Sequence, residues 1–261
     1  MPWTLPRRVE YARDLLAVLV LKELRVRYKR TVLGYAWSLL QPLAFAAVFY
    51  VVFKSFIRID TGDVDYTLFL VCGLFAWQWF ANGVTTAPLA LVGNGPLIAK
   101  VAFPRVFAVL SGFVNDAVHY LLALPVVLGA VFAFGYPPRW GWLWGVPVLL
   151  VVQGGLVLGL ALGVSALNLF LRDLERLTGI GVLMLFYLTP VVYPVSYVPA
   201  GFGWWLHANP MAGLVINWRS VLLGEAVDGS MLAASAGWAA AALAAGGLVF
   251  ARLRDRFAEA L

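Results

Sequence analysis

Two ionisable side chains inside a long apolar stretch are the first candidates for chemistry in this sequence. Asp116 and His119 stand three residues apart, so a helix places both on one face, close to Asn115. Ionisable groups in an apolar segment are costly and often carry protons or ions. The same pattern also suits a packed polar contact between helices or near a helix end, and both interpretations stay open. Gln153, in another apolar stretch, suits a hydrogen bond between helices.

Patterns that support catalysis are otherwise missing from the sequence. It has no G-x-x-x-x-G-K-[ST] phosphate loop, no G-x-S-x-G motif, no H-E-x-x-H and no C-x-x-C. One cysteine and two histidines are too few for an intrachain disulfide or a structural zinc cluster. An intramembrane transferase acting on a polyprenol phosphate would need clustered acids, but Asp60, Asp63 and Asp65 suit a solvated turn. We therefore expect no catalytic residue, metal or cofactor in this chain.

The composition indicates which elements hold these residues. Of the 261 residues, 62% are hydrophobic and 12% are charged, whereas soluble domains have roughly 45–50% and about 25%. A water-soluble globule of this size would lack the polar surface to cover itself, and disordered chains are poor in apolar residues. The apolar runs are continuous rather than alternating, which favours membrane-spanning helices over a β-barrel.

Six stretches are long enough to cross a hydrocarbon core, which takes about 20 helical residues. They are residues 33–53, 66–86, 106–134, 143–170, 177–195 and 232–250. The sequence therefore predicts an all-α integral membrane protein with six transmembrane helices in one domain, 1–261. Its parts are an amphipathic cytoplasmic interface segment, a six-span region and a cytoplasmic tail, at 1–32, 33–250 and 251–261.

The basic residues are distributed unevenly between the two sets of loops. Fifteen of the nineteen lysines and arginines fall before the first stretch, after the second, after the fourth or after the sixth. The other four are Lys54, Arg58, Arg139 and Arg219. Cytoplasmic loops carry the excess of basic residues, so both termini are predicted to be cytoplasmic. The net charge of +6 reflects this orientation and does not indicate a nucleic-acid partner.

The first 32 residues form a basic amphipathic segment. Apolar Leu15 and Leu19 precede Lys22 and further basic residues at helical spacing. We expect this segment in the cytoplasmic interface, with its apolar face toward acyl chains and its basic face toward phosphates. It is an orientation anchor, or a surface that guides an anionic lipid-linked substrate. The candidates for binding such a headgroup are Arg25, Arg27, Lys29 and Arg30.

Two further segments do not fit a simple span. The cytoplasmic loop 88–105 holds the apolar residues 97–103 between glycine and proline breakers. No lipid covers such a patch, so it docks on the chain's own helix ends or on a soluble partner. The loop 196–230 is aromatic, but its pieces are shorter than a span. It predicts re-entrant or interfacial half-helices at the outer face, an element suited to gating.

Aromatic residues near the span ends, such as Trp204 and Trp205, are typical of an interfacial belt. Others lie deeper in the predicted spans, and most of these will be packed or lipid-facing. A minority could line a pathway, since aromatic faces stack on sugar rings without a fixed register.

Four motifs together resemble a known family. They are LRVRYKRTVLGYAWSLLQP at 24–42, NGPLIAKVAFPR at 94–105, NLFLRDL at 168–174, and NPM at 209–211 with WR at 218–219 and LLG at 222–224. The chain is similar, essentially end to end, to the membrane subunit of ABC-2-type exporters of polysaccharides such as O-antigen, teichoic acid, galactan and capsule. One departure is Gly95, where relatives commonly carry an acidic or larger residue.

The resemblance implies a permease without catalysis of its own. It would move a lipid-linked polysaccharide out of the cytoplasm across the bacterial inner membrane. Two copies of the chain would work with two copies of a cytoplasmic ATPase that binds ATP and magnesium, among membrane lipids and with periplasmic export proteins as further partners. The missing phosphate loop is then explained, because the ATPase supplies it.

The resemblance also assigns roles to residues. Contacts with the ATPase would be made by Leu97, Ile98, Lys100, Val101, Phe103 and Arg105, with Arg172 and Asp173 as a second contact. The glycan channel would be lined by Trp37, Tyr50, Tyr187 and Tyr193. The outer gate would contain Trp204, Trp205, Asn209, Pro210 and Arg219.

Two alternative functions stay open at this point. An ABC exporter of drugs or other small molecules would have a similar membrane fold. A stand-alone ion-coupled secondary carrier, from a different class, would use Asp116 and His119. The second alternative is disfavoured because the sequence shows no internal repeat of the kind such carriers have and has a single buried ionisable pair.

Overall fold

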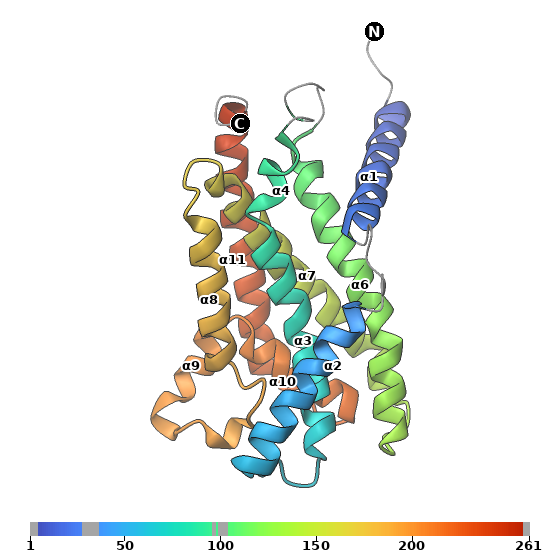
Figure 1. Cartoon of the computed structure of the whole chain (residues 1–261), viewed down its shortest axis with the longest axis vertical. Coiled ribbons are helices and arrows are strands. Elements are labelled where there is room, and N and C mark those ends of the chain that lie inside the picture. The colour runs from blue at the N-terminus through green and yellow to red at the C-terminus, as the bar shows by residue number, and fades with distance from the viewer. Residues whose placement is uncertain (1–4, 28–36, 96–97, 99–103, 258–261) are drawn as a thin grey trace.

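The computed structural model describes residues 5–27, 37–95, 98 and 104–257, and within these ranges every regular element is a helix (Figure 1). The longer elements are α1 (Leu5–Arg27), α2 (Trp37–Phe49) with the π-helix η2 (Tyr50–Phe56), α3 (Tyr66–Thr86), α6 (Val106–Ala133), α7 (Gly141–Asn168), α8 (Leu174–Leu188), α10 (Ala212–Leu223) and α11 (Gly229–Leu253). The short ones are α4 (Leu89–Val92), α9 (Gly203–Ala208) and the 3-10 turns η3 (Val195–Tyr197), η4 (Ala200–Phe202) and η5 (Arg254–Arg256).

The chain passes back and forth between the two ends of an elongated bundle (Figure 1). The longest passages are made by α3, α6, α7 and α11, while α2 with η2 and α8 each cover only part of the height of the bundle. Among the described residues, four helices are long and apolar enough to cross a membrane: α3, α6, α7, and α11 with η5. The prediction of an all-α, multi-pass membrane protein is therefore confirmed at this level.

One end of the bundle holds most of the basic segments. The start of α1, the region around α4, the turn between α7 and α8, and the C-terminal part of α11 all lie there (Figure 1). The opposite end holds α9 and α10 with the links between η2 and α3 and between α6 and α7. We call the first the inner end and the second the outer end of the molecule.

The bundle core is built around α3, whose window of membrane-spanning residues is mostly buried inside the protein. Tyr66, Leu70 and Phe75 of this helix join buried side chains of α6, α7 and α10 in one cluster. At the edge of the bundle α7 and α11 approach so closely that a Cβ on Gly246 would overlap the backbone of Gly159. Glycine is required there because only its backbone allows this contact.

Helix α8 ends earlier than expected. The apolar pattern predicts a span over 177–195, but the helix stops at Leu188 and Thr189 is extended, with φ −101° and ψ 138°. Thr189 precedes Pro190, and a residue before proline is disfavoured in the α region. Apolar composition alone does not show where a helix must stop.

The outer segment 196–230 contains short helices joined by turns, and α10 is almost fully buried. The N-terminal helix α1 also packs partly on the protein. Its Leu19 is buried in a cluster with Val109 of α6 and Leu91 of α4, while Val18 and Leu21 are exposed. The apolar face of α1 is therefore shared between the protein and its surroundings, and is not directed to acyl chains alone.

Candidate functional site

The broken end of α8 is held by a buried arginine. Arg219 of α10 is 6% exposed, and its Nη1 donates to the carbonyl oxygen of Pro190 at 2.6 Å. Its Nη2 donates to the Val191 carbonyl, and its Nε donates to the Phe69 carbonyl at 3.2 Å. Pro190 and Val191 follow the end of α8, so their carbonyl groups have no partner within that helix, and hydrocarbon offers them no water. Arg219 supplies the missing donors, so a predicted gate residue is also what makes the break tolerable.

The guanidinium of Arg219 also contacts an aromatic face and a glycine. Its Cζ lies 3.6 Å from the centroid of the Phe69 ring, a cation–π distance. A Cβ on Gly73 would overlap both this guanidinium and the Val191 carbonyl. The absence of a side chain at Gly73 is therefore what lets α10 bring Arg219 against α3.

Two other predicted gate residues bind the same broken end. Trp205 Nε1 donates to the Leu188 carbonyl at 3.0 Å, and Asn209 Nδ2 donates to Thr189 Oγ1 at 2.9 Å. Asn209 Oδ1 in turn accepts from the backbone N–H of Met211 at 2.9 Å, which fixes the start of α10. Trp204 is exposed and Pro210 is half-buried. The structure thus brings Trp205, Asn209 and Arg219 together around 188–191.

Next to Arg219, a polar chain connects three helices. Trp218 Nε1 of α10 donates to Gln153 Oε1 of α7 at 2.7 Å, and Gln153 Nε2 donates to the Ala76 carbonyl of α3 at 2.8 Å. Trp218 and Gln153 are fully buried. The prediction that Gln153 forms a hydrogen bond between helices is confirmed, and the chain fixes α10 in the bundle.

Aromatic rings connect the first and fifth predicted spans. Phe49 of α2 stacks on Phe186 of α8 with ring centroids 5.6 Å apart, and Trp77 of α3 meets the same Phe186 ring at 5.4 Å. These contacts place α2 and α8 together against α3. The two helices belong to the first and fifth predicted spans, to which the resemblance assigns the channel-lining residues.

Three of the four predicted channel residues lie on or next to these helices. Tyr50 and Tyr187 are exposed, and Tyr193 is half-buried and donates its hydroxyl to the Tyr187 carbonyl at 3.0 Å. The Tyr50 ring lies 6.4 Å from the ring of Tyr66 on α3. The side chain of Trp37 lies outside the described residues.

At the inner end, one member of the predicted coupling segment packs inside the chain. Ile98 is 8% exposed and belongs to a cluster with Leu91, Phe250 and Phe257. Arg105 is half-buried, with its Cζ 6.0 Å from the centroid of the Phe257 ring. The remaining members, Leu97, Lys100, Val101 and Phe103, lie outside the described residues.

The other predicted inner-end residues are exposed where they are described. Arg172 and Asp173 lie in the exposed turn between α7 and α8, and Arg25 is exposed on α1. The side chain of Arg27, and Lys29 and Arg30 as a whole, lie outside the described residues. Arg172 and Asp173 are thus accessible at this end, and their predicted contact with a soluble partner stays a prediction.

One residue without an assigned role joins the two inner-end loops. Asn168, the last residue of α7, is 2% exposed. Its Nδ2 donates to the Pro88 carbonyl at 2.9 Å, and its Oδ1 accepts from the Glu175 backbone N–H at 3.1 Å. The first contact fixes the start of the 88–105 loop and the second fixes the start of α8. The asparagine at the head of the NLFLRDL motif was the signal that could have indicated this role.

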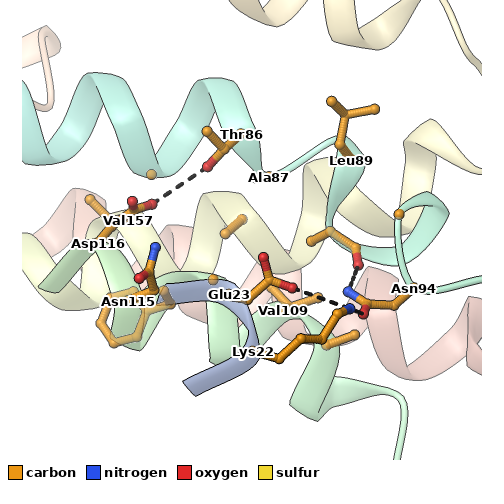
Figure 2. Close-up of a pocket in the computed structure, with 17 residues that line it drawn as sticks. Lys22, Glu23, Thr86, Ala87, Leu89, Asn94, Val109, Asn115, Asp116 and Val157 are labelled. Carbon is orange, nitrogen blue, oxygen red and sulfur yellow. Dashed lines mark hydrogen bonds and ion pairs between the residues drawn. The ribbon is translucent and has the colours of Figure 1, made fainter. Parts of the chain in front are cut away.

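A cavity of about 500 Å³ lies at the same end, between α1, α3, α4, α6 and α7 (Figure 2). Asp116 and Asn115 line it, each 5% exposed. Thr86 Oγ1 lies 3.5 Å from Asp116 Oδ2, and Lys22 Nζ donates to Asn94 Oδ1 at 2.7 Å. His119 is buried on the same helix but is not among the lining residues. The ionisable pair noticed in the sequence is therefore divided, with Asp116 facing a cavity.

Comparison with known proteins gives a consistent result along the chain. The sequence model of the family described as "ABC-2 type transporter" matches residues 14–223. A protein named O-antigen export system permease protein RfbA from Klebsiella pneumoniae is 37% identical over 96% of both chains. A protein of the same name from Myxococcus xanthus is 29% identical over 98% of this chain and 99% of its own. The polysialic acid transport protein KpsM from Escherichia coli is 22% identical over 82% and 83%.

Proposed function

Since this chain belongs to the ABC-2 type transporter family, we propose that it is the membrane-spanning subunit of an ATP-driven exporter of polysaccharide. The observation that carries this proposal is the end-to-end similarity to proteins named O-antigen export permeases. The more distant similarity to a polysialic acid transport protein points to the same chemical class of cargo. The proposed role is transport, which requires a path and a gate but no chemical change in the cargo.

We propose further that the cargo is attached to a lipid and that two copies of the chain form the path. Exposed side chains of α2, η2 and α8, including Leu43, Tyr50, Met184 and Tyr187, would face the partner copy. The contact between Phe49 and Phe186 supports this because it places these two helices side by side. Exposed aromatic rings along such a path would stack on successive sugars without fixing a register.

The outer gate in this proposal is the broken end of α8 with α9 and α10. The carbonyl groups of this break are bound by Trp205, Asn209 and Arg219. A movement of α10 would therefore displace the end of α8. Six membrane passages, with α10 as a re-entrant element, fit the back-and-forth course of the chain. The inner end would be cytoplasmic, in the inner membrane of a bacterium.

Energy would come from separate ATPase subunits that bind ATP and magnesium. Arg172 and Asp173, exposed at the inner end, and the segment 97–105 would contact these subunits. Ile98 is packed inside the chain, so it would transmit movement to the helix ends. The exposed groups would make the contact with the ATPase. We also expect the interface helix α1 to flank the opening for the lipid-linked cargo, and export proteins in the periplasm to receive it.

Deletion of the chain from its own organism tests this function. We expect surface polysaccharide to disappear and lipid-linked polymer to accumulate in the cytoplasm, both restored by the intact chain. The measurement is extraction of lipid-linked glycan from cytoplasmic and surface fractions, followed by sugar analysis. Normal surface polysaccharide, together with new sensitivity to a small toxic compound, would indicate a drug exporter instead.

A further inference from the structure

The inner-end cavity has a buried polar end that nothing in the transport path uses. The side-chain oxygen Oδ1 of Asn115 is buried and has no hydrogen-bond partner among the described residues. Buried polar atoms are nearly always satisfied, by protein or by a bound molecule. Asn115 is 5% exposed and lines the cavity, so the unmet acceptor belongs to a residue of the cavity wall (Figure 2).

The chemistry around this oxygen is that of an acceptor site. The carboxyl group of Asp116 and the hydroxyl of Thr86 line the cavity together with Asn115. The wall also includes Gly112, where an added Cβ would meet nothing within 4 Å, and Ala87 and Ala161, whose side chains are small. These residues leave room beside the acceptors. A group with several N–H donors and a positive charge fits this end best.

A cation lies elsewhere on the same cavity wall. Lys22 of α1 donates to Asn94 Oδ1 at 2.7 Å and lies 3.6 Å from Glu23. The Lys22 side chain is 45% exposed, and Leu89, which also lines the cavity, is 47% exposed. The cavity therefore has a buried, acceptor-rich end and an accessible part with an ammonium group that attracts phosphate.

The length of α3 indicates the depth at which the cavity would lie in a membrane. Helix α3 has 21 residues, so its length is about 31 Å, close to the roughly 30 Å of a hydrocarbon core. Thr86 is the last residue of α3 and is the one that reaches Asp116. A hydrocarbon core matched to the length of α3 would therefore end at Thr86, which would place the acceptor end beside a headgroup layer.

We propose that this cavity binds the headgroup of a phospholipid that ends in a primary ammonium group. The ammonium would lie at Asn115, Asp116 and Thr86, and the phosphate would lie near Lys22. Bound in this way, the lipid would join α1 to α3 and α6. The inference rests on the chain being in a membrane and does not depend on which polymer it exports.

Lipid retention by the full chain in nanodiscs tests the proposal. The nanodiscs contain equal parts of phosphatidylethanolamine, phosphatidylcholine and phosphatidylglycerol, and native mass spectrometry reports which lipid stays bound. Phosphatidylcholine has the same net charge as phosphatidylethanolamine but no N–H donor, and phosphatidylglycerol has the phosphate without the ammonium. We expect phosphatidylethanolamine to be retained most. Equal retention of phosphatidylcholine, or preferential retention of phosphatidylglycerol, would overturn the assignment.

Substitution of Asn115 gives the specific test. Asn115→Leu removes the acceptor, so retention of phosphatidylethanolamine should fall about tenfold, as expected for the loss of one hydrogen bond to a charged group. Ser235→Ala is the matched control, because Ser235 Oγ on α11 is also buried with no hydrogen-bond partner in the described part of the chain, but Ser235 does not line the cavity. It should leave retention unchanged. An equal effect of both variants, or no effect of Asn115→Leu, would contradict the proposal.

A second position keeps the test decisive if Asn115→Leu fails to fold. Lys22→Gln alters an accessible side chain and should weaken retention of phosphatidylethanolamine, whereas Lys22→Arg, which keeps the positive charge, should restore it. Unchanged retention in Lys22→Gln would contradict the proposed position of the phosphate beside Lys22. Polysaccharide export is not measured in these arms, so their failure is separate from failure of the proposed function.

Discussion

At the scale of single residues, Arg219 shows how one side chain can permit a break in a membrane helix. It donates to the carbonyl group of Phe69 in α3 and to those of Pro190 and Val191, which follow the end of α8. Its planar guanidinium presents several donors in a fixed arrangement, which a lysine ammonium cannot reproduce. A residue that the resemblance assigns to a gate therefore also has a structural function.

Replacement of Arg219 should be strongly destabilising. Arg219→Ala leaves three buried carbonyl groups without their donor, and each hydrogen bond to a charged group contributes about 1.5–3 kcal/mol. We expect the free energy of unfolding to fall by at least about 3 kcal/mol, with a smaller loss in Arg219→Lys. Thermal unfolding of the purified protein in detergent measures this.

Arg139 offers a matched control for this prediction. It is also an arginine of the outer end that donates to a backbone carbonyl, that of Gly224, at 3.1 Å, but it is exposed. Arg139→Ala should cost less than about 1 kcal/mol because water replaces the lost partner. Similar losses in the two alanine variants would show that burial of Arg219 is not what matters.

At the scale of elements, the start of α11 depends on an exposed carboxylate. Asp228 accepts from the backbone N–H groups of Met231 and Ser230, both at 3.0 Å, and from the Ser230 hydroxyl at 2.9 Å. The Met231 N–H bond, followed by the Ser230 hydroxyl, lowers the pKa of Asp228 below its ordinary value of 3.8. Because the pKa is lower in the folded state, the ionised cap contributes its full stabilisation when the pH is above the ordinary pKa. This stabilisation is lost as the pH falls through the pKa of the folded state.

Asp228→Ala should therefore lower stability in a pH-dependent manner. Near neutral pH the loss of this N-cap should cost about 1 kcal/mol. The difference from the wild type should shrink as the pH falls below about 4, because the wild-type carboxyl group becomes protonated there. Melting temperatures of both proteins across this pH range give the result. Asp228→Asn is the control, because it keeps a side-chain acceptor that does not titrate. A stability difference between Asp228→Ala and the wild type that does not change with pH would contradict the prediction.

Asn168 is a second case at the scale of elements, since it joins the loop at Pro88 to the start of α8. If both loops contact the ATPase, this side chain makes them move together. Asn168→Leu should therefore lower polysaccharide export about tenfold, in the range of typical coupling free energies, while ATP hydrolysis by the assembled complex changes little. Asn168→Asp keeps the acceptor for the Glu175 N–H but loses the donor to Pro88, so it should be intermediate. A parallel loss of hydrolysis and export would indicate a general structural defect.

At the scale of the whole molecule, the two ends should face different compartments. Cys72 is the only cysteine in the sequence and is buried, so Cys72→Ala gives a background for labelling. In that background, Asp63→Cys at the outer end should react with a membrane-impermeant maleimide in intact cells with an accessible outer face of the inner membrane. Arg172→Cys at the inner end should react only after the membrane is permeabilised. The reverse pattern would invert the predicted orientation.

The family and the fold class follow from the sequence because they depend on local properties. The excess of apolar residues in long continuous runs requires membrane helices, and the structure confirms an all-α protein with several such helices. The motifs that resemble polysaccharide exporters also lie in continuous segments, and the family match confirms that resemblance. The predicted bounds of the fifth span, 177–195, were wrong, because α8 ends at Leu188. The apolar content of a segment does not include the effect of Pro190 on the backbone of Thr189.

What only the tertiary structure decided depends on contacts between distant segments. The sequence analysis named Arg219 and Asp116 as candidates and included Asn168 only as part of a motif. It could not show that Arg219 binds carbonyl groups just after α8, that Asp116 lines a cavity beside α1, or that Asn168 binds a loop eighty residues away. A buried polar group must find its partner in three dimensions, and periodicity along one helix does not identify that partner. Thus the sequence by itself determined that this protein is a membrane helix bundle of an exporter family. The packing of α10 and α1 against the bundle decided where its polar groups act, because in hydrocarbon every such group must be satisfied by another part of the chain or by a bound lipid.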